Sequence, residues 1–456
     1  MKEDALTRLA RVVAEDVLEP DPDTLSVLSN AMIDTLGCIH LGARTDLAQK
    51  ARDAVVEMSA AGTSQVIGTE MQTSRPQAAF LNAVAGHALD FDDWEYPGNT
   101  HPTTVLFPAL LAVATQETSG PEFAKAYLAG FEVIARIGEG INFEHYNAGW
   151  HSTATLGAPG AAAACSRLLG LTAAETAHAM SIAISTASGF ACQFGADAKP
   201  LQAGFAARAG VEAACLAEAG LAGNSHILDH PRGMAALMGG LVPERLENAL
   251  QKIGTGYALS EHGLVVKPWP SCGYSQRIMT CATGLSDRVT VDHVAGIDLH
   301  LPDFHAAVAT YHQPESRSEA LFSLPFVAAM GLVHHRLTVA DLDSGLWEDD
   351  IIRDLIGKTK VHPFAPRRPD LNYAQEDPDR MVVTFTDGNT LEEACIYPLG
   401  APQAPMSSAQ IWAKFDANLG PQTEAHASRR VWSAQLQNWT ERPSVLSLFT
   451  AQGRMQ

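Results

Sequence analysis

Paired cysteines, long apolar runs and positive charge are all scarce in this chain of 456 residues. The seven cysteines are scattered and form no Cys-x-x-Cys pair, which argues against a disulfide framework or a structural zinc site and suits a reducing cytoplasm. No run reaches the ~18 apolar residues that a transmembrane helix needs, and the N-terminal MKEDALTRLARVV lacks the apolar core of a signal peptide. We therefore expect a soluble cytoplasmic protein.

Basic residues are few relative to acidic ones. Lys and Arg total 31 against 51 Asp and Glu, so the formal net charge is −20 at pH 7. A surface this acidic repels nucleic acid and anionic membranes, and we expect neither as a partner. It is also the wrong overall field for an anionic substrate, so a site for carboxylates must gather its own cations.

Hydrophobic spacing separates a long helical part from a smaller mixed part. Apolar residues recur at three- and four-residue intervals, which predicts helices over 25–43, 102–117, 123–141 and 173–189. Many contact positions in this part are Ala, Gly or Ser, which lets helix axes approach closely. Beyond Lys267 the pattern predicts a strand over 294–302, a buried helix over 321–335, a helix running into a strand over 347–363, and a hairpin around Asp387-Gly388.

These patterns indicate a mainly α fold made of two unequal domains. We expect a large all-helical bundle domain formed by residues 1–267 and 398–456, and a smaller α+β lid domain formed by residues 268–397. Helical spacing returns at 407–420 and 428–443, and these segments should pack back on the bundle. The functional site is expected between the two domains, where clefts usually form.

The stretch HALDFDDWEYPGNTHP is the richest in groups that can carry chemistry. One alternative is a solvated acidic loop at the end of a helix. A second is a metal site, the basis of a metal-dependent hydrolase, built from His87, Asp90, Asp92 and His101.

A third alternative for the same stretch is acid–base chemistry. Asp93 would then fix the tautomer of His101 or hydrogen-bond the substrate. Because His101 precedes Pro102 at the start of the next predicted helix, it would feel the positive end of that helix, which suits anion binding.

Three further motifs supply one or two candidates each. EHYNAGWHSTATLG contains Tyr146, an acid if its pKa is depressed, and His151; DAKPLQAG contains Lys199; and VVKPWPSCGYSQR contains Lys267 and Arg277. Taken singly, such a histidine is more often structural and such a lysine is usually solvated. The local cationic set that a di- or tricarboxylate site requires would consist of His101, His151, Lys199, Lys267 and Arg277.

The motifs HALDFDD…THP, GWHSTATLG, DAKPLQAGFAARAG, KPWPSCGY and EALFSLPF resemble, in order and spacing, those of the MmgE/PrpD family over nearly the whole chain. That family includes 2-methylcitrate dehydratase, cis-aconitate decarboxylase and iminodisuccinate epimerase. The resemblance implies a large helical domain with an α+β lid, a homodimer, small polycarboxylate substrates bound between the domains, and no metal or organic cofactor.

The resemblance also assigns pocket residues. The positions that match the family motifs are Asp93, His101, His151, Lys199 and Lys267. The chain departs from the family pattern at two places. Trp94 stands where many members have Thr, and residues 271–276 lack the histidine that often follows the lysine–proline turn.

All these activities break a bond at the carbon next to a carboxylate, so they need preorganised cations and a base. Lys199, Lys267 and Arg277 are the expected cations, and His101 or His151 is the expected base. The missing lid histidine weakens a dehydratase or a decarboxylase, whereas Tyr146 and the lysines can serve a two-face epimerase.

The compact length and the KPWPSCGY turn also resemble the iminodisuccinate epimerase branch. We therefore expect an isomerase of that type. The alternatives are a hydro-lyase like 2-methylcitrate dehydratase, a lyase like cis-aconitate decarboxylase, and a non-catalytic polycarboxylate-binding protein.

Overall fold

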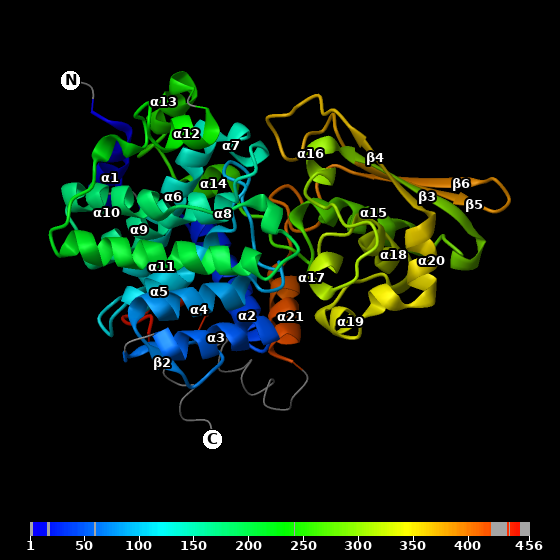
Figure 1. Cartoon of the computed structure of the whole chain (residues 1–456), viewed down its shortest axis with the longest axis horizontal. Coiled ribbons are helices and arrows are strands. Elements are labelled where there is room, and N and C mark those ends of the chain that lie inside the picture. The colour runs from blue at the N-terminus through cyan, green and yellow to red at the C-terminus, as the bar shows by residue number, and fades with distance from the viewer. Residues whose placement is uncertain are drawn as a thin grey trace.

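The computed structural model describes residues 3–15, 19–58, 61–240, 242–420, 436 and 438–446. Within them the chain is mainly α-helical, as predicted, with one four-stranded sheet. The helices of roughly the first 260 residues lie together on one side of Figure 1, and the sheet with its covering helices lies on the other.

The first part of the chain contains α1 (Ala5–Glu15), α2 (Pro22–Gly42), α3 (Asp46–Met58), β1 (Ser64–Gln65), β2 (Gln72–Thr73), α4 (Arg75–His87), α5 (Pro102–Val113), α6 (Gly120–Ile141), α7 (Glu144–Asn147), α8 (Ser152–Thr155), α9 (Gly157–Leu169), α10 (Ala173–Thr186), α11 (Ala198–Glu218), α12 (Met234–Gly239), α13 (Pro243–Gln251) and α14 (Ala258–His262). The second part contains α15 (Gln276–Ser286), β3 (Val294–Pro302), α16 (Asp303–Ala306), α17 (Arg317–Ala320), α18 (Leu324–His334), α19 (Val339–Asp343), α20 (Asp350–Lys358), β4 (Thr359–Phe364), β5 (Asp379–Phe385), β6 (Thr390–Cys395) and α21 (Ser408–Leu419).

The helix termini follow local side-chain chemistry. In α6 the Ser119 hydroxyl accepts from the Glu122 N–H while the Glu122 carboxylate accepts from the Ser119 N–H, a reciprocal capping box. Thr172 and Glu175 form the same box at the start of α10. Proline opens α5 at Pro102, where its missing N–H costs nothing.

Small residues bring the central helices close together, as predicted. A Cβ atom added at Gly130 of α6 would lie 2.8 Å from the Cβ of Ala164 and 2.8 Å from the carbonyl oxygen of Gly160, both on α9. Such distances leave no room for a methyl group, so glycine at this position sets the separation of α6 and α9.

The apolar interior forms two large clusters. One is built from the helices of the first part, and α21 joins it through Ile411 and Phe415, so the predicted return of 407–420 to the bundle is confirmed. The other is built mainly from residues 265–401, but Trp94 and Phe194 of the first part also belong to it. The domain boundaries at 267 and 398 stay a prediction.

The sheet has the strand order β4-β3-β5-β6. Strand β3 is parallel to β4 and antiparallel to β5, with Leu299 opposite Val361 on one side and Met381 on the other. Helices α15 and α20 pack against it, and β5 and β6 form the hairpin predicted around Asp387-Gly388, with Gly388 at φ 85°.

Other features of the fold were missed by the sequence analysis or are not tested by the structure. The short β1–β2 ladder in the helical part was not predicted. Most of the helix predicted over 428–443 lies outside the described residues. Within the part that is described, residues 439–441 form a 3-10 turn. No helix among the described residues is both long and apolar enough to span a membrane. The expected homodimer and cytoplasmic location stay predictions.

The α6–α9 contact generates a stability prediction. Gly130→Ala should lower the free energy of unfolding by about 1–3 kcal/mol, because the added methyl overpacks the interface. The control is Gly357→Ala in α20, where an added Cβ meets no atom within 4 Å. Ala is the better helix former, so that variant should gain roughly 0.5–1 kcal/mol. Urea unfolding of both measures the difference, and equal effects would contradict the packing argument.

Candidate active site

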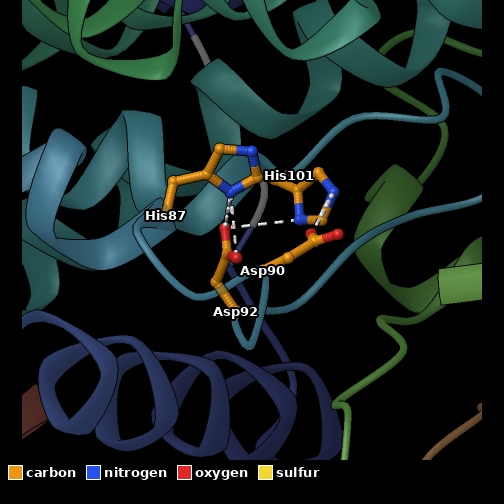
Figure 2. Close-up of side chains that lie close together, drawn as sticks. All are labelled: His87, Asp90, Asp92 and His101. Atoms are coloured by element: carbon orange, nitrogen blue, oxygen red, sulfur yellow. Dashed lines mark hydrogen bonds and ion pairs between the residues drawn. The ribbon is translucent and has the colours of Figure 1, made fainter. Parts of the chain in front are cut away.

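The loop between α4 and α5 carries most of the acidic candidates. Helix α4 ends at His87 and α5 begins after His101, so both histidines are held at helix ends on either side of the loop. Asp90 adopts φ 50°, in the left-handed region that Asp tolerates better than most residues. This turn brings the loop carboxylates back toward the two histidines, as Figure 2 shows.

Asp92 is the carboxylate that contacts both histidines (Figure 2). Its Oδ2 atom lies 2.9 Å from Nδ1 of His87 and 3.3 Å from Nδ1 of His101. His101 also approaches Asp90, with 3.6 Å between its Nε2 and Asp90 Oδ1. Asp92 is fully buried, so these contacts fix both imidazole rings.

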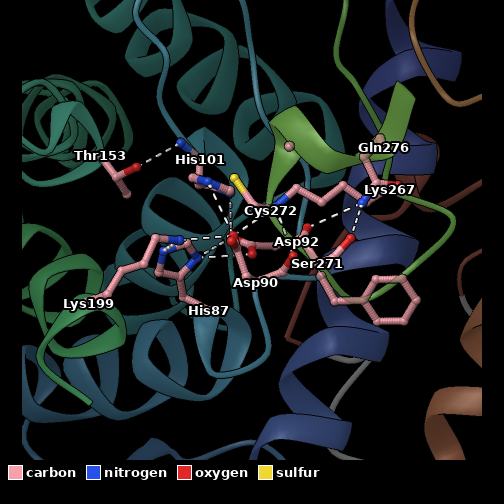
Figure 3. Close-up of polar contacts among 12 residues, drawn as sticks. His87, Asp90, Asp92, His101, Thr153, Lys199, Lys267, Ser271, Cys272 and Gln276 are labelled. Carbon is pink, nitrogen blue, oxygen red and sulfur yellow. Dashed lines mark hydrogen bonds and ion pairs between the residues drawn. The ribbon is translucent and has the colours of Figure 1, made fainter. Parts of the chain in front are cut away.

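Asp90 binds two ammonium groups that come from distant parts of the chain (Figure 3). Lys199 of α11 donates to Asp90 Oδ1 at 2.9 Å, and Lys267 donates to the same oxygen at 2.8 Å. Lys267 also donates to the Asp90 carbonyl at 2.8 Å, and Lys199 approaches Nε2 of His87 at 2.9 Å. All four residues are buried.

The charges of this cluster balance. Although burial opposes ionisation, the charges of Lys199 and Lys267 hold the pKa of Asp90 well below its usual value. Hydrogen bonds from the His87 and His101 rings hold the pKa of Asp92 well below its usual value. Burial lowers the pKa of His101 to about 3 and also lowers that of His87, so both are neutral at pH 7. Two carboxylates therefore face two ammonium groups.

His151 is held differently, by an amide. It precedes α8, and its Nδ1 lies 2.6 Å from Oε1 of Gln202 on α11. The Gln202 Nε2 group donates to the Phe190 carbonyl at 3.4 Å, which orients the amide oxygen toward the ring. Nδ1 must therefore carry the proton, because an amide oxygen only accepts. The Nε2 atom of His151 is buried and has no hydrogen-bond partner among the described residues.

The electrostatics keep His151 neutral. Burial lowers its pKa well below the usual histidine value, and the nearby Lys199, His87 and His101 lower it further. A neutral imidazole whose Nδ1 carries the proton presents a lone pair at Nε2, which is the form a general base requires.

A cavity lies at this cluster. Its polar wall includes Asp90, His101, His151 and Lys199, and its apolar wall includes Phe194, Val308 and Phe322. The lining residues come from both parts of the chain. A site between two domains stays a prediction.

The structure brings together most of the residues predicted from the sequence. His101, His151, Lys199 and Tyr146 all line the cavity. Tyr146 is not an activated acid, however, because burial raises its pKa instead of depressing it. The condition under which Tyr146 would act as an acid, a depressed pKa, is therefore not met.

Asp93 does not orient His101, contrary to the sequence prediction. Its carboxyl group accepts hydrogen bonds from the hydroxyl and the N–H of Thr103, on the side of the helical interior. Burial raises its pKa well above the usual value. Asp92 therefore faces the histidines and Asp93 faces Thr103.

Two predicted cations do not line the cavity. Lys267 lies behind Asp90 and is bound to it. Arg277 is fully buried in an ion pair with Asp379 and donates to the Asp377 carbonyl at 3.1 Å. Burial without a carboxylate partner is costly for a guanidinium, and Asp379 meets that need from β5.

Sequence reasoning missed Gln202, which holds His151, and several residues of the cavity lining. Gln202 lies three positions after Lys199 on α11, so the helical repeat could have placed both on one face. Phe194 and Phe322 had no signal beyond their apolar character. No pattern in the sequence distinguished Asp92 from the aspartates beside it.

The metal alternative has a geometric basis. Ligand atoms of His87, Asp90, Asp92 and His101 lie within 4.8 Å of one another. The ammonium groups of two lysines, however, already bind Asp90 Oδ1. A divalent cation would have to lie beside them, so the donor set fits an ion-pair network better than a metal site.

Comparison with known proteins agrees with the motifs. The chain matches the model of the MmgE/PrpD N-terminal domain over residues 7–245 and that of the MmgE/PrpD C-terminal domain over residues 269–438. The protein therefore belongs to the MmgE/PrpD family, which confirms the resemblance seen in the sequence.

Similar curated proteins are decarboxylases. Cis-aconitate decarboxylase of Mus musculus is 29% identical over 407 residues, which cover 85% of this chain and 80% of the relative. That of Homo sapiens is 28% identical over 404 residues (85% and 82%), and that of Aspergillus terreus 25% over 427 residues (88% and 86%). These relatives favour a lyase over the epimerase expected from the sequence.

The low pKa of His101 predicts a pH dependence of stability. The unfolded chain binds a proton at this histidine below pH ~6.5, whereas the folded protein does so only near pH 3. The free energy of unfolding therefore falls as pH drops through this window. His101→Gln should make the fall shallower by up to ~1.4 kcal/mol per pH unit, measured by urea unfolding between pH 6.5 and 4.5. An unchanged slope would mean that folded His101 is already protonated.

Proposed function

We propose that the protein is a lyase that removes CO₂ from a small unsaturated tricarboxylate of the cis-aconitate type. The observation that carries the proposal is the Nε2 atom of His151, which has no hydrogen-bond partner among the residues that the structure describes and lies in a cavity that also holds Lys199. The relatives named as cis-aconitate decarboxylases support the choice of reaction.

The reaction makes two demands on the site. When the carboxymethyl arm of cis-aconitate loses CO₂, the C–C bond breaks and its electron pair forms a new C=C bond with the central carbon. The old double bond then delivers its pair to the vinyl carbon, which takes up one proton. The site must therefore stabilise negative charge next to a remaining carboxylate and supply a proton at carbon.

His151 meets the second demand. Its Nε2 takes a proton when the anionic substrate brings negative charge into the cavity, because a nearby negative charge raises a histidine pKa. The protonated ring then delivers that proton to carbon. Gln202 keeps Nδ1 as a donor throughout, so the ring stays in one orientation. This role also removes the need for the histidine missing from residues 271–276.

Lys199 and the apolar wall meet the first demand. The Lys199 ammonium group lies 5.4 Å from the centroids of both the Phe194 and the Phe322 ring. A carboxylate placed against these rings is poorly solvated, which favours its loss as neutral CO₂. The ammonium group beside them stabilises the charge that remains.

The properties of Tyr146 weaken the case for an epimerase. That reaction needs an acid on one face of the carbon and a base on the other. Tyr146 was the sequence candidate for one of these roles, and its raised pKa makes it unsuitable for rapid proton exchange near pH 7.

The test is turnover of cis-aconitate in D₂O, followed by CO₂ release and NMR. The wild-type protein should release CO₂ and form a five-carbon unsaturated dicarboxylate with one deuterium on the former vinyl carbon. His151→Gln should lower kcat by about 10²-fold or more, because the proton donor is lost, with a small effect on KM.

The control for this variant is His178→Gln on α10, which does not line the cavity. It should keep the wild-type rate. A hydrated six-carbon product would instead indicate a dehydratase. Deuterium in an intact substrate skeleton would indicate an epimerase, and no turnover of cis-aconitate would contradict the proposal.

A further inference from the structure

Two N–H groups in the cavity wall have no hydrogen-bond partner among the described residues. They are the indole Nε1–H of Trp94 and one N–H of the Asn99 amide nitrogen Nδ2. Both residues line the same cavity as His151 and Lys199, and they are only 4% and 7% exposed. Buried donors without partners are rare, and each costs about 1–3 kcal/mol, so the pair requires an explanation.

The orientation of the Asn99 amide is fixed by its neighbours. Asn372 Nδ2 donates to the Tyr96 carbonyl at 3.2 Å, which only an N–H group can do. The same nitrogen donates to Asn99 Oδ1 at 2.5 Å, and Asn372 Oδ1 accepts from the Tyr274 hydroxyl at 2.9 Å. Asn99 Oδ1 is therefore the acceptor, and its Nδ2 is the group left over.

The Tyr274 phenol engages one N–H of this amide. Burial raises the pKa of Tyr274, and a hydrogen bond from the Asn99 side chain opposes that rise. Because Nδ2 carries two N–H bonds, one remains without a partner among the described residues and is available to a ligand.

Trp94 is equally constrained. Its N–H and carbonyl pair with those of Val265 at 3.0 and 2.8 Å. Its ring makes edge contacts with Tyr274 and Tyr373, at centroid distances of 6.0 and 5.6 Å. A Cβ added at Gly273 would lie 3.1 Å from Trp94 Nε1, so glycine keeps the N–H edge uncovered.

The charge balance of the site indicates what these N–H donors could bind. Lys199 is already paired with Asp90, and Lys267 lies behind it. A substrate with two or three carboxylates therefore meets fewer unpaired cations than it has negative charges. Neutral N–H groups bind a carboxylate without needing a countercharge, and hydrogen bonds to a charged acceptor are the stronger kind.

We infer that Trp94 Nε1 and Asn99 Nδ2 together form a subsite for one carboxylate of the substrate, namely one that is not lost in the reaction. The inference deepens the proposed function and relies on it only for the substrate class. It also makes Trp94 a specificity residue, at a position where many family members have Thr.

The direct test is a ¹H–¹⁵N spectrum of the indole groups with tricarballylate, a saturated tricarboxylate that cannot react. The chain has seven tryptophans, and Trp94→Phe identifies the Trp94 signal. That signal should move downfield on titration, as expected for an N–H that gains a carboxylate acceptor. The signal of Trp347 should not move; its indole nitrogen is also buried and has no partner in the described ranges, but the residue does not line the cavity.

Affinity gives the second readout. Trp94→Phe keeps an aromatic side chain but removes the indole N–H. The Kd for tricarballylate should therefore rise about tenfold or more. Asn99→Asp keeps the acceptor for Asn372 and suits the positive φ of 54°, but it replaces a donor with a carboxylate. Its Kd should rise further and recover as the pH falls. Trp347→Phe is the matched control and should bind like the wild type.

The outcomes separate the two proposals. If the wild type binds tricarballylate and both cavity variants bind it equally well, the subsite is wrong while the substrate class stands. If the wild type binds no tricarboxylate, the proposed function itself is contradicted. Melting temperatures of all variants show whether a loss of binding reflects a loss of fold.

Discussion

The buried carboxylate of Asp90 is the interaction on which the site depends. It binds the ammonium groups of Lys199 and Lys267, which come from α11 and from the segment before α15. Removing one partner of a buried ion pair typically costs about 3–5 kcal/mol, because the other charge is left uncompensated. The triplet therefore fixes the α4–α5 loop against two segments that are remote in the sequence. Because both lysines are already paired with Asp90, their charges are less available to the carboxylates of a substrate.

Because Asp90 neutralises these lysines, the rest of the cavity must bind an anionic substrate by other means. Neutral histidines surround a cluster whose formal charges cancel. One imidazole nitrogen and two N–H groups beside it have no partner within the described part of the chain. Such a site can accept an anion by hydrogen bonds and by taking up protons. A proton taken up by His151 on binding is also the proton that the proposed reaction delivers to carbon. Substrate binding and proton transfer would then depend on the same side chain.

Much of the fold follows from the sequence, because helical periodicity, capping residues and the Asp387-Gly388 turn act locally. His101, His151 and Lys199 were found because each belongs to a motif that the helix ends place at the cavity. Asp93 was mistaken for Asp92 because the left-handed turn at Asp90 sets which carboxylate faces inward, and periodicity does not predict that turn.

Arg277 was misplaced because its partner Asp379 lies on a distant strand, and only the tertiary structure brings the two together. The epimerase expectation came from a missing lid histidine, the compact length and the KPWPSCGY turn. The relatives named as cis-aconitate decarboxylases favour a lyase instead.

Proton uptake on binding is the most direct test of the charge-balanced site. Tricarballylate binding would be measured by calorimetry at pH 7 in two buffers of different ionisation enthalpy. If the cluster has no spare positive charge, a buried trianion must raise a histidine pKa, and about one proton per site should be taken up. Binding with no proton uptake would show that the site already holds uncompensated cations and would contradict the account.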